Sequence, residues 1–328
     1  MRPVLKRGLL PVWRDRDTLQ IGIDSRRAVA LAGMAGVASV IGLLDGSRDR
    51  AQVIETAADQ GIPAKTTERV LALLAAAGAL DDFPAGTLRL LPPPLRARLA
   101  AELAAASLAH RDGDGGARTL ARRLTAQIRI HGAGTVGTGI ASLLERSGIG
   151  QVTHAESGTL RPGAALAGNG GPGTARPGTA PPGEALPDLA ILVGRHPMDL
   201  RASLMRDQIP HLAVAADEAI GVVGPLVIPG RTACLRCLDL TRAERDPAWP
   251  LILAQLEGRE PDPLACDAPL AAAVAAQAAA QVLAFVDRAV AADPVADGTL
   301  ELVLPGWQWR RRTWPRHPGC SCGSHAAR

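Results

Sequence analysis

The chain has 328 residues, of which 47% are apolar and 21% charged, so it can bury a core and is not globally disordered. This length predicts about two domains. Lysine plus arginine number 36 against 32 aspartate plus glutamate, and aromatic residues are only 2% with no tyrosine, which argues against a surface that stacks nucleic-acid bases.

No segment has the pattern of a targeting signal or a membrane span. Residues 28–44 are apolar but short and are interrupted by three glycines, and residues 268–286 contain Gln277 and Gln281. Both stretches are typical of core elements. Four of the five cysteines occur in close pairs, which indicates a metal site in a reducing compartment. We therefore expect a cytoplasmic protein without membrane or nucleic-acid partners.

Residues 1–88 predict a small α+β domain. Alternation around residues 15–17 predicts a hairpin, and residues 26–33 add a third strand. Three helices follow, at residues 34–44, 49–60 and 64–77. Strands followed by three short helices predict a winged-helix domain.

Residues 43–61 and 66–82 (LLDGSRDRAQVIETAADQG and TTERVLALLAAAGALDD) resemble PqqD-like leader-peptide-recognition domains. The resemblance implies that a peptide adds as a strand at the sheet edge and packs against the third helix. A DNA-binding winged helix needs a basic third helix, but residues 64–77 offer only Lys65 and Arg69. A scaffold or dimerisation module is the remaining alternative.

Residues 89–125 carry arginine and alanine at helical spacing before a polar break, which predicts a helical connector. A second domain is then expected over residues 126–328. Within it, residues 161–187 contain 13 glycines and prolines among 27 residues, a composition typical of a mobile loop.

The second domain begins with a glycine-rich turn in a βαβ context. A strand at residues 126–131 runs into Gly132, Gly134 and Gly137, and a helix, a second strand at 151–155 and Glu156 follow. This is the dinucleotide-binding fingerprint, with Glu156 placed to bind ribose hydroxyls. The same glycines also serve helix–strand packing, so nucleotide binding stays one of two interpretations.

Two cysteine pairs, Cys234 with Cys237 and Cys320 with Cys322, predict a tetrahedral zinc site. Four protein ligands leave no position for a catalytic water, so the zinc would be structural. Cys266 stands alone and is expected to be a small buried hydrophobe. Residues 306–317 interleave tryptophan with arginine. We interpret them as a strand with its arginines in water rather than as a nucleic-acid surface.

The glycine turn, the segments GIGQVTHAESGTL, DLAILVG and GPLVIPGRTACLRCLDL, and the last cysteine pair together resemble the ThiF/MoeB ubiquitin-activating-like superfamily. That resemblance implies a Rossmann-like α/β fold, adenylation of a peptide carboxylate with Mg-ATP, a structural zinc and commonly a dimer. The sequence departs from the family where the chemistry occurs. Gly158 falls where a second aspartate is expected, His196 replaces a metal-binding aspartate, and no lysine follows Lys65.

We therefore predict a ThiF-like protein, preceded by the PqqD-like domain, that binds a precursor leader peptide. It resembles the partner proteins of azoline-forming pathways, in which a separate YcaO-type enzyme consumes the ATP. No catalytic residue is assigned. The alternative is a working adenylyltransferase in which Arg195, Arg201, Asp199 or Asp217 replace the missing groups. A third hypothesis, an NAD-dependent oxidoreductase, rests on the glycine turn and Glu156 alone.

Overall fold

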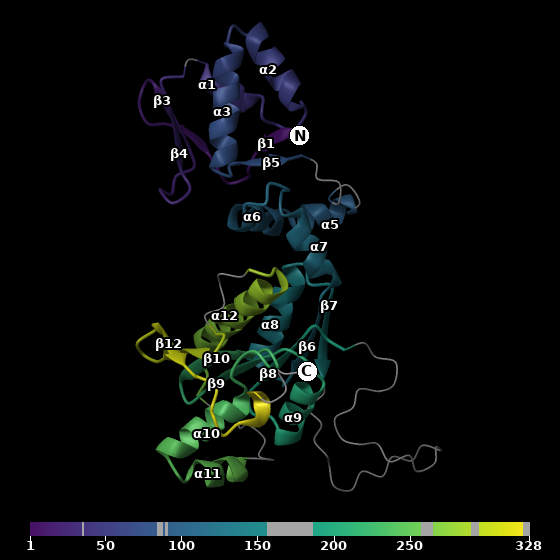
Figure 1. Ribbon diagram of the computed structural model, residues 1–328, viewed down its shortest axis with the longest axis vertical. Helices are drawn as coiled ribbons and strands as arrows, with labels where there is room; N and C mark the ends of the chain where they lie inside the picture. The colour runs from purple at the N-terminus through teal and green to yellow at the C-terminus, as the bar shows by residue number, and fades with distance from the viewer. Residues whose placement is uncertain are drawn as a thin grey trace, which may run out of the picture. The chain divides into compact units, whose positions relative to one another are not determined.

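The computed structural model describes residues 1–34, 36–83, 88, 91–155, 186–256, 265–289 and 295–323 (Figure 1). The chain divides into two compact parts, which we call unit 1 and unit 2. Unit 1 is Met1–Arg122 and unit 2 is Arg123–Arg328. The predicted loop at 161–187 lies outside the described residues except at its end, and Glu156 lies outside them entirely.

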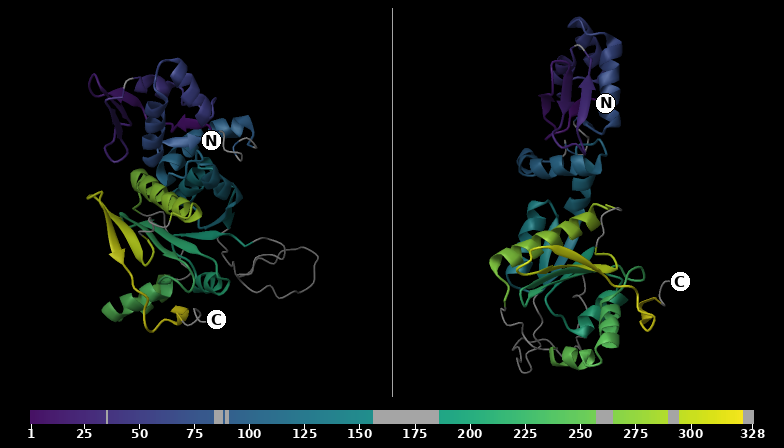
Figure 2. Two further views of the ribbon diagram at one scale, coloured as in Figure 1. Left: turned by 45° about the horizontal axis from the view of Figure 1, so that its top comes forward. Right: turned by 90° about the vertical axis from the view of Figure 1, so that its left-hand side faces the viewer.

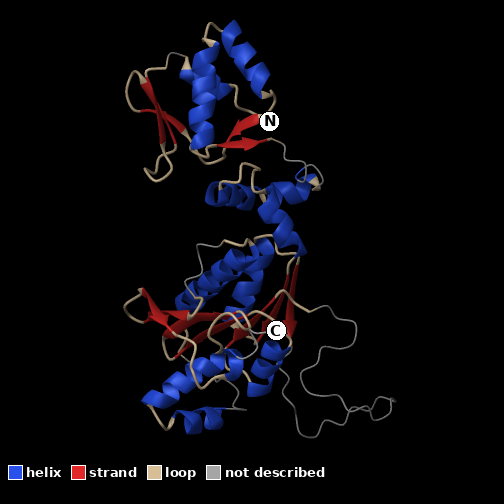
Figure 3. Ribbon diagram, in the orientation of Figure 1, coloured by secondary structure: helices blue, strands red, loops and turns tan. Residues whose placement is uncertain are grey.

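Unit 1 contains a three-stranded antiparallel sheet in the order β2-β3-β4, covered by three helices (Figure 3). Its strands and helices are β2 (Pro11–Trp13), β3 (Thr18–Ile21), β4 (Val29–Ala32), α1 (Val37–Gly42), α2 (Arg50–Asp59) and α3 (Ala64–Ala76). The predicted hairpin, third strand and three helices are all present. The first helix is shorter than the predicted 34–44.

Local signals explain where the helices of unit 1 start. The Asp49 side chain accepts a hydrogen bond from the Gln52 backbone N–H, and the Gln52 side chain accepts one from the Asp49 N–H. This reciprocal capping box satisfies two N–H groups that the first helical turn leaves unpaired. Leu19, Leu31 and Leu74 are buried in the core between sheet and helices.

The described residues of unit 1 also include three further helices and a second small sheet. Strand β1 (Pro3–Leu5) pairs antiparallel with β5 (Leu80–Asp82). The helices are α5 (Pro93–Arg98), α6 (Ala100–His110) and α7 (Ala117–Thr125), the last of which crosses the division between the units.

A buried ion pair joins these pieces of unit 1. Lys6 Nζ lies 3.0 Å from Asp81 Oδ1 and donates to Ser107 O at 2.7 Å. The Ser107 hydroxyl donates to Asp81 Oδ2 at 2.7 Å. The Lys6 residue is only 1% exposed. A charge this deeply buried is tolerated because its partners satisfy it, and here they come from β5 and α6.

Unit 2 is built on a seven-stranded sheet in the order β12-β11-β10-β9-β8-β6-β7. The strands β6 to β9 run parallel, and β9 to β12 alternate in direction. Their bounds are β6 (Gln127–His131), β7 (Gln151–Ala155), β8 (Leu189–Val193), β9 (His211–Asp217), β10 (Ile220–Val227), β11 (Gly298–Val303) and β12 (Trp309–Thr313).

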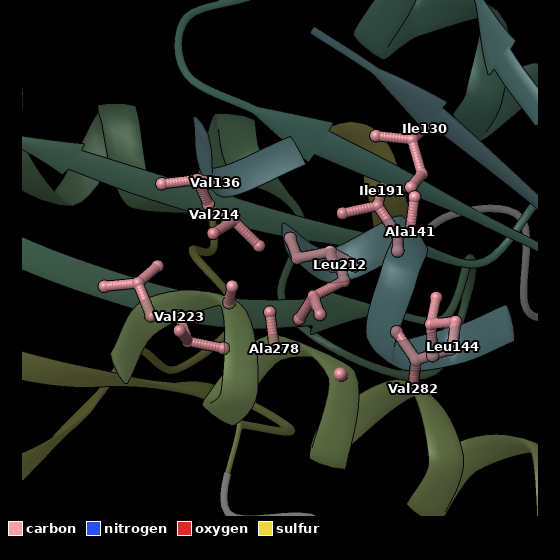
Figure 4. Packing of buried hydrophobic residues seen from close by; sticks show 14 of the residues in the cluster. Ile130, Val136, Ala141, Leu144, Ile191, Leu212, Val214, Val223, Ala278 and Val282 are labelled. Atoms are coloured by element: carbon pink, nitrogen blue, oxygen red, sulfur yellow. The ribbon is translucent and has the colours of Figure 1, made fainter. Parts of the chain in front are cut away.

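Helices cover both faces of this sheet (Figure 2). On one face α8 (Thr135–Arg146) and α12 (Ala268–Val286) pack over Ile130, Ile191 and Leu212 (Figure 4). On the other face α9 (Met198–Arg206) and α10 (Leu235–Arg245) pack over Leu192 and Val227. Short helix α11 (Trp249–Leu256) follows α10. Unit 2 is therefore the mixed α/β fold that the sequence predicted.

Among the described residues, one helix is long and apolar enough to cross a membrane, namely α12. One side of it belongs to the core cluster of unit 2, where Val274, Ala278 and Val282 are fully buried. Burial against α8 and the sheet thus accounts for the apolar length of α12, as expected of the core helix in a doubly covered sheet.

Candidate functional site

Three glycines shape the connection between β6 and α8. Gly132 has φ +106°, and a Cβ atom there would lie 2.3 Å from the Val193 carbonyl oxygen of β8. Gly134 has φ +93° and caps α8, while a Cβ at Gly137 would lie 3.3 Å from the Gly132 oxygen. Packing therefore requires glycine at Gly132. At Gly134 no atom of the described residues lies within 4 Å of an added Cβ, so the described part of the chain leaves the start of α8 open.

An open helix start beside the carboxyl ends of parallel strands is where α/β folds bind anionic ligands. Two charged groups among the described residues at this edge of unit 2 are Arg195, which follows β8, and Asp217, which ends β9. An Arg195 guanidinium nitrogen lies 3.6 Å from Asp217 Oδ2, and both side chains are roughly half exposed. The two charges therefore compensate each other across neighbouring strands.

Two histidines lie at the same edge. The rings of His131 and His196 meet edge to face with centroids 6.4 Å apart. His196 Nε2 lies 3.0 Å from the Val193 carbonyl, which fixes that nitrogen as the donor. Burial lowers the pKa of His131 to about 4, and burial also lowers the pKa of His196. Both imidazoles are thus neutral at pH 7 and add no positive charge for a phosphate.

The other residues that could replace the missing groups of an adenylyltransferase are not brought to Arg195 and Asp217. Arg201 on α9 donates to Asp239 Oδ2 on α10 at 2.8 Å, which directs its charge toward α10. Asp199 is exposed in the first turn of α9. Glu156 and Gly158 are not among the described residues. Of these candidates, the structure brings Arg195 and Asp217 together.

The two cysteine pairs converge. Cys234 Sγ lies 3.8 Å from Cys237 Sγ and 3.6 Å from Cys320 Sγ, and Cys237 Sγ lies 3.4 Å from Cys322 Sγ. All four sulfurs lie within 4.8 Å of one another. Disulfides have sulfurs about 2 Å apart, whereas thiolates at about 2.3 Å from a tetrahedral zinc lie about 3.8 Å apart. The four cysteines therefore fit one metal ion.

Rigid surroundings hold both cysteine pairs. Cys234 is the residue that precedes α10, and Cys237 lies in the first turn of that helix. Trp314, which is 2% exposed, anchors the last segment because its indole N–H donates to Thr299 Oγ1 at 2.9 Å. A metal ion here would tie the end of the chain to the start of α10.

Burial sets the protonation of two of the four thiols in the absence of a metal, whereas the pKa of Cys237 is lowered because hydrogen bonds outweigh the effect of its burial. Burial raises the pKa of Cys234 well above the ordinary thiol value and raises the pKa of Cys322 to about 11. These two thiols are therefore protonated at pH 7. A bound metal ion would displace the protons and stabilise the thiolates.

Cys266 lies apart from the cluster. It packs against the hydrophobic core, as expected of a small hydrophobe, but it is partly exposed rather than buried. It directly precedes Asp267, which caps α12 by accepting from the Leu270 N–H. The start of that helix is where the chain leaves the core, which explains the exposure.

Unit 1 has an open strand edge. Among the described strands, β4 pairs only with β3, and the Gly33 N–H donates to the Asp17 carbonyl at 3.0 Å. Hydrogen-bonded pairs alternate along an antiparallel ladder. The backbone groups of Ala30 and Ala32 therefore point away from β3, toward the open edge. The exposed side of α3 carries Leu73, which is 39% exposed.

Sequence reasoning missed a cluster of arginine and tryptophan in unit 2. The Arg242 guanidinium lies 4.9 Å from the ring centre of Trp249 and 5.2 Å from that of Trp314. Arg312 stacks on Trp314 at 4.7 Å. The interleaved tryptophans and arginines of residues 306–317 were the available signal, but that segment contains neither Arg242 nor Trp249.

Comparison with solved structures shows the same fold in several proteins. Escherichia coli MccB bound to succinimide superposes with a TM-score of 0.65 at 16% identity, covering 99% of this chain and 100% of MccB. The heterocyclase TruD gives 0.64 at 17% identity, covering 98% of this chain and 43% of TruD. MccB has also been solved with AMPCPP and MccA, with a TM-score of 0.62 at 17% identity and coverage of 98% of this chain and 100% of MccB.

A heterocyclase in complex with substrate and cofactor gives a TM-score of 0.62 at 13% identity, covering 95% of this chain and 38% of that protein. The chain thus spans all of MccB and less than half of TruD and this heterocyclase. No protein-family model matches the chain, and no curated protein does either. At these identities the likeness establishes the fold.

Proposed function

We propose that this chain is a ThiF-like protein of ribosomal peptide maturation that binds a precursor (leader) peptide and presents it to a separate YcaO-type enzyme. The support is a fold that covers nearly the whole chain in both MccB, which was solved with MccA, and a heterocyclase solved with substrate. The PqqD-like domain (1–88), the connector (89–125) and the ThiF-like domain (126–328) are the proposed divisions of the chain.

The observation that carries peptide binding is the open edge of β4. Ala30 and Ala32 direct backbone donors and acceptors outward, and their small side chains leave room for a neighbouring strand. A peptide in extended conformation would satisfy these groups by β-augmentation. Lys65, Arg69 and Leu73 on the exposed side of α3 supply charge and apolar surface for its side chains.

The charged groups in unit 2 are poorly suited to bind Mg-ATP, which supports a protein that does not adenylate its peptide. Mg²⁺ bound to a nucleotide requires carboxylates that are free to coordinate it, but Asp217 faces the Arg195 guanidinium. The two lysines of the sequence, Lys6 and Lys65, both belong to unit 1. Unit 2 therefore has no lysine with which to neutralise phosphates.

The four cysteines are proposed to hold a structural zinc ion. Four thiolates complete a tetrahedral zinc site and leave no open position for water. The ion would stabilise the fold of unit 2 and take no part in a reaction. Free thiols held for a metal fit the reducing conditions of the cytoplasm. A homodimer, as is common in the family, is part of the proposal.

Peptide binding is tested by selecting a displayed library of 25-residue peptides on the full-length protein. The Ala30→Pro variant removes one outward N–H without touching the β3–β4 ladder, and Ala30→Val is the control that keeps this N–H. We expect enriched peptides to bind the wild type and Ala30→Val, and to lose at least tenfold in affinity for Ala30→Pro. Equal binding to all three proteins would refute β4 as the peptide site.

The second candidate is an adenylyltransferase, which the open start of α8 favours. Calorimetric titration of Mg-ATP into the zinc-loaded protein separates the two functions. The proposed scaffold gives no binding heat at millimolar ATP. Micromolar binding, about −8 kcal/mol, would establish the adenylyltransferase instead.

A further inference from the structure

Helix α10 carries an arginine whose guanidinium group has no hydrogen-bond acceptor among the described residues. The Arg242 guanidinium lies over the indole rings of Trp249 and Trp314, at 4.9 Å and 5.2 Å from their centres. Its ion pair with Asp239 spans 4.0 Å, which is too long for a hydrogen bond. The Arg242 side chain is only 39% exposed. Its N–H donors are thus partly shielded from water and are not satisfied by the described part of the chain.

Two carboxylates of the same cluster bind other groups. Asp239 Oδ2 accepts a hydrogen bond from Arg201 at 2.8 Å. Glu301 lies 3.8 Å from Arg312, and its Oε1 accepts from the Thr299 hydroxyl at 3.0 Å. Neither acid accepts a hydrogen bond from the unsatisfied guanidinium, which leaves its acceptor to be supplied by a bound molecule.

The cluster carries one excess positive charge. Arg201, Arg242 and Arg312 contribute three positive charges, while Asp239 and Glu301 contribute two negative ones. Burial lowers the pKa of Arg242, and the neighbouring guanidinium groups also lower it, against the opposing effect of the two acids. Donors that are removed from water without an acceptor cost free energy. A single added anion would therefore balance the charges of the cluster and supply the missing acceptor.

A carboxylate fits this requirement better than a phosphate monoester. Its two oxygens match two N–H groups of the planar guanidinium fork, and it carries one negative charge. A phosphate monoester carries about 1.5 to 2 negative charges at pH 7, which is more than the cluster needs. Ile252, which is 36% exposed, lies three residues after Trp249 and therefore on the same side of α11. Apolar surface thus accompanies the cation.

We propose that Arg242 binds a peptide carboxylate that is flanked by an apolar side chain. The carboxylate would accept hydrogen bonds from the guanidinium, and the apolar side chain would lie against the side of α11 that carries Trp249 and Ile252. An acidic side chain and the end of a chain both present such a carboxylate, and the experiment distinguishes them. This inference does not depend on the proposed function, in which the peptide site is the edge of β4 in unit 1.

The test uses full-length, zinc-loaded protein and three N-acetylated dipeptides that end in 4-fluorophenylalanine, with binding followed by fluorine NMR. The first has glutamate and a C-terminal amide, the second has glutamine and a free C-terminus, and the third has glutamine and an amide and is uncharged. We expect at least one carboxylate probe to bind tenfold more tightly than the uncharged probe, because charge-assisted hydrogen bonds are strong. The tighter of the two identifies the source of the carboxylate. Equal binding of all three probes would overturn the proposal, as would displacement by a lower concentration of inorganic phosphate than of acetate.

Arg242→Gln removes the proposed binding group, and Arg245→Gln removes an exposed arginine of the same helix as the matched control. We expect at least a tenfold loss of affinity for the carboxylate probe in the first variant and no change in the second. Glu301→Gln keeps an acceptor for the Thr299 hydroxyl and raises the excess charge of the cluster from one to two. It should tighten binding about threefold, as for one partly exposed charge, and it leaves Arg242 in place. Equal affinities of Arg242→Gln and Arg245→Gln, or no tightening by Glu301→Gln, would contradict the assignment.

Discussion

Lys6 is a single buried residue that links three segments of unit 1. It is held by Asp81 from β5 and by Ser107 from α6, so three segments depend on one cation. Removing one partner of a buried pair leaves the other charge without compensation, which costs more than the pair itself contributes.

We therefore expect Lys6→Met to reduce the free energy of unfolding by about 3–5 kcal/mol. The loss is measured by urea denaturation at pH 7. The control is Lys65→Met, which changes an exposed lysine and should shift stability by less than about 0.5 kcal/mol. Similar effects of the two substitutions would mean that the buried ion pair does not matter for stability.

His211, the first residue of β9, is a buried titratable group of unit 2. It is 1% exposed, and burial lowers its pKa to about 4. The unfolded chain binds a proton at this residue near pH 6.5, while the folded chain does so only near pH 4. Between these values the unfolded state holds more protons, so stability falls as pH falls.

The expected contribution of His211 is on the order of 3 kcal/mol, lost between pH 6.5 and pH 4. His211→Asn should flatten the pH dependence of stability in that range, because an amide can still donate to the Ile209 carbonyl but does not titrate. Urea unfolding at pH 7.5, 5.5 and 4.5 checks this. An unchanged slope in the variant would assign the acid sensitivity to other groups.

At the scale of elements, the β6–α8 connection contains glycines that are required for two different reasons, a positive φ and a lack of room for a Cβ atom. An alanine at Gly132 would meet both an unfavourable φ and the Val193 carbonyl. An alanine at Gly134 would meet only the unfavourable φ. We expect Gly134→Ala to lower the free energy of unfolding by about 1–3 kcal/mol through backbone strain alone. We expect Gly132→Ala to lower it by about 2 kcal/mol more, because of the added steric clash. Chemical denaturation of both variants measures the difference, and equal costs would rule out the steric argument.

Elements with local signals were predictable. The helix that begins at Asp49, the glycine turn and the strand alternation around residues 15–17 each lie within one short segment. The pairing of β1 with β5 was not predicted, because three-residue strands far apart in sequence have no periodicity that reveals a partner. The same applies to α11, whose eight residues are apolar except for Gln255 and have no repeat that distinguishes helix from strand.

At the scale of the whole molecule, each unit has its own core. Among the described residues, one hydrophobic cluster lies entirely in unit 1 and two lie in unit 2. The cysteine cluster lies only in unit 2. We expect two thermal transitions, with tryptophan fluorescence following unit 2 because Trp314 is buried there.

Removing the metal should act on one transition alone. A chelator or Cys237→Ser is expected to lower the unit 2 transition by more than about 10 °C, since structural zinc contributes several kcal/mol to folding. Cys266→Ser, outside the cluster, is the control and should leave one zinc per chain by elemental analysis. If Cys237→Ser retains stoichiometric zinc, the four-cysteine site is wrong.

Of the candidate sites, the cysteine cluster could be predicted from the sequence, whereas the pairing of Arg195 with Asp217 could not. The spacing of the cysteines was enough to predict that the four sulfurs lie together, because the two cysteines of each pair are close in sequence and four thiolates can bind a single metal ion. The pairing of Arg195 with Asp217 depends on β8 and β9 being neighbours with a fixed register. The register between two strands cannot be read from a local sequence pattern. From the sequence, Arg195 and Asp217 were therefore only two of several candidates for the nucleotide site.

The burial of Lys6 has a practical consequence for chemical labelling. The sequence has two lysines, and one of them is enclosed. Apart from the terminal amine, Lys65 on α3 is then the single reactive amine of the folded protein. An amine-specific fluorophore will therefore mark one known helix, α3, whose exposed side belongs to the proposed peptide site, without any engineered attachment site.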